Sequence, residues 1–387
     1  MSSRERKRKK TTTKNHSPTT IPIPSLPDDL MWNCFARVSR FYYPSLSLVS
    51  TTYRSLIVSP ELYETRSLLG NIEICLYVCL KFRPDDYPRW FTLCRKPDRT
   101  QTSKTKKSSG YVLASVSSPS SLPLAYCSCL VALGSDIYKI GGPIDHKPSS
   151  SVSVLDCRTH TWRDAPSLLV KRLFPSACVV DGKIYVGGGC RENGDSDSLN
   201  SIEVFDSKTQ TWDHVPSPNP NPKWELSWGC LPRSACIKGK FHLILGDKSL
   251  AYDPKVGKWD SVTGNMAQYW IWSYCTIDNV LLSFYNGYFQ WYDTKLRFWK
   301  RLKGLVGLPK FASDDHVKVA DYGGKLAVLW DMNTPSSGGC KKKMLYCAEI
   351  SLLKCDGDEI WGMVEWIDGV LPVPDSYELV KVLAVSL

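Results

Sequence analysis

The chain has 387 residues, of which 43% are hydrophobic and 22% charged, a composition typical of a folded, water-soluble protein. Its length predicts one large domain plus a small one, or two to three modest domains. The longest nearly unbroken apolar run, Ile74 to Leu80, is far shorter than the roughly 18 residues that a membrane-spanning helix needs. We therefore expect no membrane partner.

The formal charge of +11 is concentrated at the N-terminus, where residues 1 to 14 alone contribute +6. A nucleic-acid-binding protein usually carries clustered Lys and Arg on its folded part, so the sequence disfavours DNA or RNA as a partner. Residues 1–20 are charged and then rich in Ser, Thr and Pro, which predicts a disordered basic tail. Its RERKRKK run has two readings, a nuclear localisation signal or a solvated tail.

The N-terminus is charged where a secretory signal has an apolar segment of about 7 to 15 residues. We therefore expect the chain in the nucleus, the cytoplasm or both. The 15 cysteines are odd in number, and in a reducing compartment thiols stay free, so we expect no disulfides.

Residues 21–68 have a helical pattern. Pro27, Asp28 and Asp29 predict a helix start, and apolar residues follow at steps of three and four. A second helix is expected after Pro44, with one apolar stripe from Leu46 to Ile57, and a third after Ser59 and Pro60. These stripes carry more apolar surface than about 40 helical residues can bury on each other, so the module needs a partner.

Residues 72–387 consist of short β-rich runs broken by Gly, Pro, Asp and Ser, which predicts an all-β domain. Residues 100–124 interrupt it with a Ser/Lys-rich excursion, within which Tyr111 to Val116 has the composition of a strand.

One unit repeats four times in the β-rich part: an apolar residue, Asp, any residue, Lys or Arg, three residues, Trp. The Asp can form an Asx-type turn, and the Trp can cover a neighbouring sheet. A strand with Cys, a turn and a second strand precede each unit; we expect these cysteines in the core. The expected structural residues are Asp156, Trp162, Asp206, Trp212, Asp253, Trp259, Asp293 and Trp299.

The successive Trp residues are 50, 47 and 40 positions apart, close to the period of about 50 residues of a kelch repeat. Together with the glycine doublets, this pattern resembles the kelch β-propeller family. The resemblance implies a mainly β fold with six blades, the first and last centred on Trp90 and Trp361. Ring closure then requires the last strand, Tyr377 to Val385, to return to the first blade.

The helical segment resembles an F-box in the sequences SLPDDL, LSLVS, YRSLI and SPELY. An N-terminal F-box followed by a kelch domain is similar to the plant F-box/kelch-repeat family. The resemblance implies a non-catalytic subunit of a ubiquitin ligase, in which the F-box binds a Skp-type adaptor and, through it, cullin and RING subunits. The propeller would then bind an unknown protein substrate. The adaptor-facing positions implied by the resemblance are Leu26, Pro27, Leu30, Val49, Tyr53 and Leu56, some of which would pack the module internally.

Substrate contacts are expected on loops at one rim of the propeller, because loops held by a rigid scaffold concentrate binding residues. The loops between second and third strands and between blades share that rim in a kelch-like blade. Their Arg and aromatic residues are of the types that dominate interface energetics, and their charge favours an acidic or phosphorylated segment. The candidates are Arg172, Arg191, Arg233, Tyr269 and Trp270.

Other functions leave weaker traces. The six histidines are scattered with no pair at metal-ligand spacing, and the pairs Cys75/Cys79 and Cys127/Cys129 lack the two paired knuckles of a zinc site, so we expect no metal and no cofactor. A propeller oxidase of the copper-radical type would need paired His and Tyr ligands and a Cys–Tyr crosslink, and no such set is readable. The alternatives that stay open are a kelch scaffold without a ligase role and a helical segment that only caps the propeller.

Overall fold

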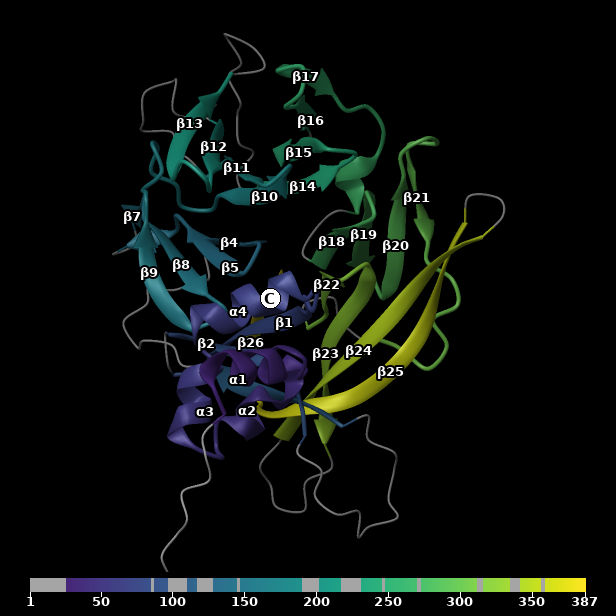
Figure 1. Ribbon diagram of the computed structural model, residues 1–387. Coiled ribbons are helices and arrows are strands. Elements are labelled where there is room, and N and C mark those ends of the chain that lie inside the picture. The colour runs from purple at the N-terminus through teal and green to yellow at the C-terminus, as the bar shows by residue number, and fades with distance from the viewer. Residues whose placement is uncertain are drawn as a thin grey trace, which may run out of the picture.

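The computed structural model describes residues 26–84, 87–96, 110–116, 128–144, 147–189, 202–216, 231–245, 248–269, 273–311, 316–334, 342–355 and 359–387. Four short α-helices are followed by six four-stranded antiparallel sheets arranged as the blades of a β-propeller (Figure 1). Within these residues, the helices are all too short or too polar to cross a membrane. The fold is the mainly β propeller with an N-terminal helical module that the repeats indicated.

The helical module comprises α1 (Asp28–Ala36), the 3-10 turn η1 (Arg40–Tyr42), α2 (Tyr43–Leu46), α3 (Thr51–Leu56) and α4 (Pro60–Leu68). The start of α1 after Pro27 confirms the sequence prediction. The prediction of one helix from Leu46 to Ile57 is wrong, because Ser50 is extended and its hydroxyl accepts a hydrogen bond from the backbone N–H of Tyr53 at 3.1 Å. This cap starts a new helix and divides the stripe between α2 and α3.

Each blade is numbered here in chain order, and its strands run from the centre outward. Blade I contains β26 (Tyr377–Ser386), β1 (Ile74–Phe82), β2 (Pro88–Arg95) and β3 (Tyr111–Val116). Blade II contains β4 (Cys129–Leu133), β5 (Asp136–Ile140), β8 (Val152–Asp156) and β9 (Thr161–Ala165), with β6 (Pro143–Ile144) and β7 (Lys147–Pro148) forming a separate small pair. Blade III contains β10 (Ser176–Val180), β11 (Lys183–Gly187), β12 (Ile202–Asp206) and β13 (Thr211–Val215).

The second half of the ring has the same organisation. Blade IV contains β14 (Arg233–Ile237), β15 (Lys240–Leu245), β16 (Lys248–Asp253) and β17 (Lys258–Ser261), and the 3-10 turn η3 (Met266–Gln268) leads to the next blade. Blade V contains β18 (Ser273–Ile277), β19 (Val280–Tyr285), β20 (Tyr288–Asp293) and β21 (Phe298–Arg301). Blade VI contains β22 (Lys318–Tyr322), β23 (Lys325–Thr334), β24 (Lys342–Cys355) and β25 (Glu359–Pro374).

The ring closes through its two ends. The C-terminal strand β26 pairs antiparallel with β1, from Ile74 opposite Ser386 to Phe82 opposite Tyr377. Glu73 and Leu387 exchange two further backbone hydrogen bonds of 2.7 and 2.9 Å. The predicted return of the last strand to blade I is confirmed, and it covers the edge of β1 that an open ring would leave exposed.

The four repeat units share one hairpin between their third and fourth strands. In each, the Asp carboxylate accepts a hydrogen bond from the backbone N–H two residues later, at 2.9 to 3.0 Å. The residue four positions after the Asp has a positive φ and donates its N–H to the Asp carbonyl. An Asx turn therefore closes the hairpin and explains why the unit begins with Asp. The positive-φ residues are His160, Gln210, Gly257 and Arg297.

Three of the four repeat Trp residues donate a hydrogen bond to the chain that enters their blade, whereas the indole N–H of Trp162 is buried without a partner among the described residues. The indole Nε1–H of Trp212 donates to the carbonyl of Pro166 at 2.8 Å, and that of Trp259 donates to Pro216 at 2.7 Å. Trp299 donates in the same way to Asn265 at 3.1 Å. Each ring lies beside the residue before the Asp of its own unit, its cross-strand partner. In blades III, IV and V the Trp thus connects the blade to the link from the preceding blade.

The first and last blades depart from the predicted unit. Trp90 lies on the third strand of blade I, where the repeat Trp residues lie on the fourth, and it packs against Trp162 with ring centroids 6.2 Å apart. The fourth strand is instead β3, inside the predicted excursion. Trp361 lies on the fourth strand of blade VI but is substantially exposed. The placement of Trp90 as a repeat Trp was therefore wrong, although the number of blades was correct.

The strands of each blade run alternately in opposite directions, so the connections between them lie on two opposite rims of the ring. Turns between first and second strands, such as that at Gly134, lie on the same rim as turns between third and fourth strands, such as that at Cys157 to His160. We call this the near rim. Connections between second and third strands, and links between blades, lie on the opposite rim, which we call the far rim. Because adjacent strands are antiparallel, this assignment follows directly from the strand order.

Arg172 joins two blades from the link between β9 and β10. Its guanidinium lies 2.7 Å from the Glu203 carboxylate of blade III, and both side chains are fully buried. It also donates to the carbonyl of Gly188 at 2.7 Å, and its own carbonyl accepts from the N–H of Gly142 in blade II at 3.0 Å. Gly188 and Gly189 have φ of +75° and +78°, and a Cβ on either would lie under 3 Å from the neighbouring link. These glycines allow the links to pack closely on the blade.

Replacing Arg172 should destabilise the propeller strongly. Arg172→Met leaves the Glu203 carboxylate buried without its counter-charge, so we expect the free energy of unfolding to fall by about 3 to 5 kcal/mol. The double variant Arg172→Met with Glu203→Gln removes that buried charge while retaining an acceptor for Leu169, and it should recover at least about half of the loss. Urea denaturation measures both. Equal losses in the single and double variants would contradict a buried charge pair.

Candidate adaptor-binding and substrate-binding surfaces

The helical module shares a hydrophobic core with the propeller. Phe35, Leu56, Leu62 and Tyr63 pack in one cluster with residues of blades I and II, among them Tyr77 of β1. The C-terminal Leu387 also belongs to this cluster. The propeller therefore covers the inner apolar stripes of the module. The expectation that these stripes need a partner is confirmed for the inner side, where the partner is the propeller itself.

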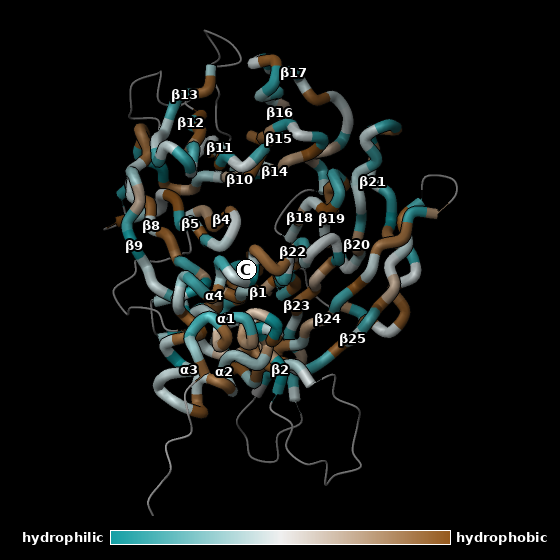
Figure 2. The backbone as a smooth tube through the Cα atoms, viewed as in Figure 1, coloured by the Kyte–Doolittle hydropathy of each residue, from teal (hydrophilic) through white to brown (hydrophobic). Residues whose placement is uncertain are grey.

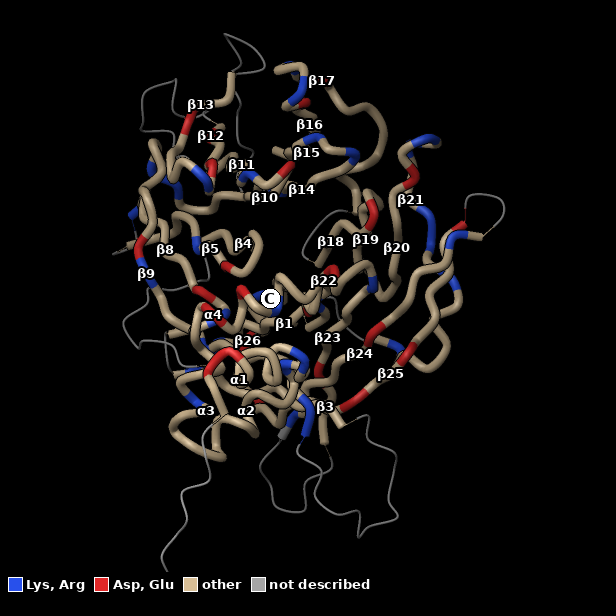
Figure 3. The backbone as a smooth tube through the Cα atoms, in the orientation of Figure 1, with Lys and Arg blue, Asp and Glu red and all other residues tan. Residues whose placement is uncertain are grey.

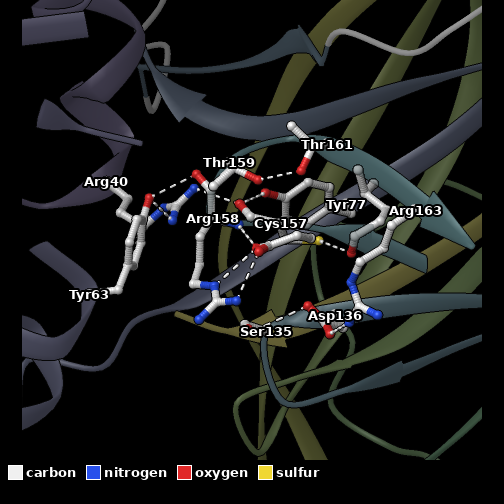
Figure 4. Close-up of polar contacts among 12 residues, drawn as sticks. Arg40, Tyr63, Tyr77, Ser135, Asp136, Cys157, Arg158, Thr159, Thr161 and Arg163 are labelled. Atoms are coloured by element: carbon white, nitrogen blue, oxygen red, sulfur yellow. Dashed lines mark hydrogen bonds and ion pairs between the residues drawn. The ribbon is translucent and has the colours of Figure 1, made fainter. Parts of the chain in front are cut away.

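Buried polar groups fix the module on the near rim (Figure 4). Arg40 donates to the hydroxyl of Tyr63 at 2.5 Å and to the carbonyl of Cys157 at 3.1 Å. The Tyr63 hydroxyl also lies 3.1 Å from the carbonyl of Arg158. Because Cys157 and Arg158 form the turn between β8 and β9, these contacts hold the module against the near rim of blade II. An unsatisfied buried carbonyl or guanidinium is costly, so the contacts specify one orientation.

Glu73 connects the module to the closure of the ring. Its carboxylate accepts from the backbone N–H of Arg40 at 2.7 Å and pairs with the buried guanidinium of Arg66 at 3.1 Å. Arg66 also donates to the carbonyl of Val38 at 2.9 Å. The backbone N–H and carbonyl of the same Glu73 are hydrogen-bonded to Leu387. The helices, the first strand and the last residue thus meet at one point.

The outer face of the module retains apolar residues in water. Leu26, Leu30 and Val49 are 55%, 48% and 65% exposed to solvent. Pro27, which follows Leu26 in the chain, is also exposed. Leu48, next to Val49, is more exposed still. Phe35 of α1 and Tyr53 of α3 have ring centroids 4.8 Å apart, so α1 and α3 are in contact. An apolar face of this kind is typical of a protein-binding surface.

Two of the six candidate adaptor residues have a different environment. Leu56 is buried in the shared core, and Tyr53 is partly buried against Phe35. Leu56 therefore packs the module internally, as some of these residues were expected to do. The exposed apolar residues near the start of α1 and just before α3 are Leu26, Pro27, Leu30, Leu48 and Val49, and we call this set the F-box face. The sequence analysis did not select Leu48, although its position beside Val49 in the LSLVS segment was a usable signal.

The candidate substrate residues are not brought together. Arg172 is fully buried in its pair with Glu203, so its selection as a rim contact was wrong: an Arg in a loop can serve blade packing instead. Arg233 begins β14 and is partly buried, with its Nε shielded from solvent. Tyr269 packs against Tyr285 and Trp299, at centroid distances of 5.4 and 6.3 Å. Arg191 and Trp270 lie outside the described residues.

The central channel is lined by the innermost strands of all six blades. A cavity of about 390 Å³ lies there, with Cys178, Cys236 and Cys275 on its wall and Lys381 of β26 among its charged residues. The repeated cysteines were expected in the core, and these three are half-buried: each packs against a hydrophobic cluster of the blades while also lining the channel wall. Burial raises the pKa of the Cys178 thiol, and the neighbouring Cys236 and Cys129 raise it further. Every cysteine in the described ranges is a free thiol.

Charge and metal ligands do not define a further site. Acidic and basic positions are interspersed around the described part of the ring (Figure 3), whereas a nucleic-acid-binding face carries clustered Lys and Arg. Hydrophobic positions recur along the strands of every blade (Figure 2), consistent with packing between blades. In the part of the chain that the structure describes, no three His, Cys, Asp or Glu side chains are grouped as metal ligands.

The free energy of unfolding should fall in mild acid because of His160, which lies where the helical module meets blade II. Burial, together with the nearby Arg40, lowers the pKa of His160 from 6.5 to about 4, and its Nε2 lies 2.9 Å from the Tyr77 hydroxyl. Between pH 6.5 and 4 the unfolded chain binds a proton that the folded chain excludes, so stability falls as the pH falls. From pH 7 to 5 we expect His160 to cost on the order of 1 to 2 kcal/mol. Urea denaturation of the unmodified chain and of His160→Asn should show a smaller pH dependence in the variant.

Asn is the suitable replacement because it tolerates the positive φ of His160. His242, which burial also shifts to a pKa of about 4, remains in both proteins and provides a common background. Identical pH dependence in the two proteins would contradict a role for His160.

Comparison with known proteins accounts for both parts of the chain. A family model described as "FKB95, Kelch-repeats domain" matches residues 90–371, and the F-box domain model matches residues 23–65. The F-box/kelch-repeat protein At4g39550 of Arabidopsis thaliana is 53% identical, over 99% of each chain. At4g39570 is 52% identical over the full length of both chains, and At5g51250 is 51% identical over 94% of this chain and 100% of its own.

A solved structure of YjhT aligns over 65% of this chain with a TM-score of 0.37 and 12% identity, which is too distant to add to the fold described above. The relatives, in contrast, match from the helical module through the last blade. The chain therefore belongs to the F-box/kelch-repeat family.

Proposed function

We propose that this chain is the substrate-recognition subunit of a Skp–cullin–F-box ubiquitin ligase. The F-box face would bind a Skp-type adaptor and, through it, the cullin and RING subunits. The propeller would bind the protein to be ubiquitylated. The observation that carries the proposal is an apolar F-box face that remains exposed after the inner side of the helices is buried on the propeller.

The arrangement of the two rims supports separate binding sites for the adaptor and for the target protein. The module contacts the near rim through Cys157 and Arg158, which leaves the far rim on the opposite side of the ring. The shared core and the Glu73 contacts resist rotation between the two parts. A target held on the far rim would therefore have a defined position relative to the adaptor. In this role the chain is non-catalytic, because it supplies binding surfaces and the partner subunits supply the chemistry.

Charged substitutions on the F-box face should weaken adaptor binding without unfolding the chain. Leu30→Asp and Val49→Asp introduce a carboxylate into a face that must be dry in the complex, so we expect adaptor affinity to fall at least about tenfold. Leu68→Asp is the matched control, since Leu68 is also in the module and is 88% exposed. Co-purification of each variant with a plant Skp-type adaptor measures binding. Undiminished binding by both face variants would leave the helices as a cap on the propeller.

We also propose that the basic segment RERKRKK directs the chain to the nucleus. The segment contributes most of the net charge of the N-terminal tail and lies outside the described residues. Deleting residues 1–14 from a fusion to a reporter too large for passive entry should shift its fluorescence from the nucleus to the cytoplasm. The matched control replaces the same residues by a Gly/Ser sequence of equal length. An unchanged distribution would assign the segment to a solvated tail.

A further inference from the structure

The closing strand β26 pairs with β1 in two parts. A register shift between Cys79 and Leu80 divides the pairing, so that residues 381–386 form one half and residues 377–379 the other. We call them the near half and the far half, after the rim at which each one ends. Blade I is built from both ends of the described chain, so release of β26 opens the ring without breaking the strand pairs of another blade.

The far half is anchored to blade VI. The hydroxyl of Tyr377 donates to the carboxylate of Asp331 on β23 at 2.7 Å. Tyr377 and Leu379 also pack in one hydrophobic cluster with Leu329 of the same strand. These contacts lie within the propeller, so the ring itself supplies the anchor for this half.

The near half is anchored through Glu73, which precedes β1. The backbone N–H and carbonyl of Glu73 exchange hydrogen bonds of 2.7 and 2.9 Å with Leu387, which follows β26. The Glu73 carboxylate accepts from the N–H of Arg40 at 2.7 Å and lies 3.1 Å from the buried guanidinium of Arg66. Displacing Glu73 would leave that guanidinium without its counter-charge. The residue that holds the end of β26 is therefore itself held by the helical module.

Apolar contacts connect the same helices to the near half. Phe35 of α1 and Leu62 of α4 belong to the hydrophobic cluster that contains Val385 and Leu387. Figure 1 shows the C-terminus beside α4, in agreement with this cluster. The helix α1 also carries Leu30, which is exposed on the F-box face. A change that loosens these helices would therefore reach both the near half and the F-box face.

We propose that the docked helices stabilise the pairing of the near half with β1, and that adaptor binding strengthens this pairing. An adaptor on the F-box face would bind docked helices better than loosened ones, and a ligand shifts an equilibrium toward the state that it binds better. By the same linkage, adaptor affinity depends on closure of the ring. The adaptor step rests on the proposed function, whereas the coupling between the helices and the near half is a property of the free chain.

Hydrogen exchange of the free full-length chain tests the coupling. Leu62→Ala removes a fully buried side chain of the shared cluster. We expect the amides of residues 74–79 and 381–386 to exchange at least about tenfold faster in this variant. The amides of β15 in blade IV should change less than about twofold. Mass spectrometry of peptides from these segments measures all of the rates.

Leu243→Ala is the matched control, because Leu243 of β15 is 1% exposed and packs in a cluster of blades III and IV. It should accelerate exchange in β15 and leave the near half within about twofold. Glu73→Gln is a milder second variant, since it retains the shape of the side chain and removes the charge that faces Arg66. It should accelerate exchange of the near half at least about threefold.

The adaptor step is tested by adding a plant Skp-type adaptor at about 100 times its Kd. We expect exchange of the near half to slow at least about threefold, within a limit of about 100-fold set by mass action. The amides of β26 belong to the innermost strand of blade I, so an adaptor on the F-box face does not cover them directly. An unrelated protein at the same concentration should leave the rates unchanged.

Two results with the free chain would overturn the coupling. One is unchanged exchange of the near half in both Leu62→Ala and Glu73→Gln, and the other is equal acceleration of that half by Leu243→Ala. An adaptor that binds and leaves the near half unchanged would overturn the adaptor step alone. An adaptor that does not bind would overturn the proposed function and the adaptor step together, while the free-chain rates still decide the coupling.

Discussion

Closure of the ring by β26 is the constraint on which the rest of the molecule depends. Each blade buries its faces against two neighbours, so a ring that stays open would expose two whole sheet faces and the edge of the first strand. The pairing of β26 with β1 removes that edge and brings Leu387 to Glu73. The same Glu73 holds Arg40 and Arg66 of the helical module. Ring closure and the orientation of the F-box are thus parts of one structure.

The shared contacts at Glu73 also relate the positions of the two proposed binding surfaces. The helices do not have a separate core: Phe35, Leu62 and Tyr63 share one with Tyr77 and Leu387. A module that packs into a shared core loses independent motion, and its position is then set by the blade it contacts. An adaptor on the F-box face and a target on the far rim would be separated by the depth of the propeller, with blades I and II as the connection.

The residue type in a loop does not by itself predict whether the side chain binds a partner or packs between blades. Arg172 and Arg233 are residue types that bind partners, yet Arg172 is fully buried beside Glu203 because the links of a propeller must also hold neighbouring blades together. The link between β21 and β22 returns to the end of β23, where Phe311 packs edge-on against Trp330, and no local sequence pattern encodes this contact between distant segments.

The sequence by itself determined the propeller class and placed four of the blades, because the Asp-to-Trp unit reports an Asx turn that each of its four copies forms. These turns, at Asp156, Asp206, Asp253 and Asp293, are local interactions. The count of six blades and the closing strand followed from the repeat spacing and from the need of a propeller to close. Only the tertiary structure decided which side chains are exposed, including the burial of Arg172 and Leu56 and the placement of Cys178, Cys236 and Cys275 on the channel wall. Exposure depends on which segments distant in the chain cover a residue, and that is set by the packing of blades and helices around the closed ring.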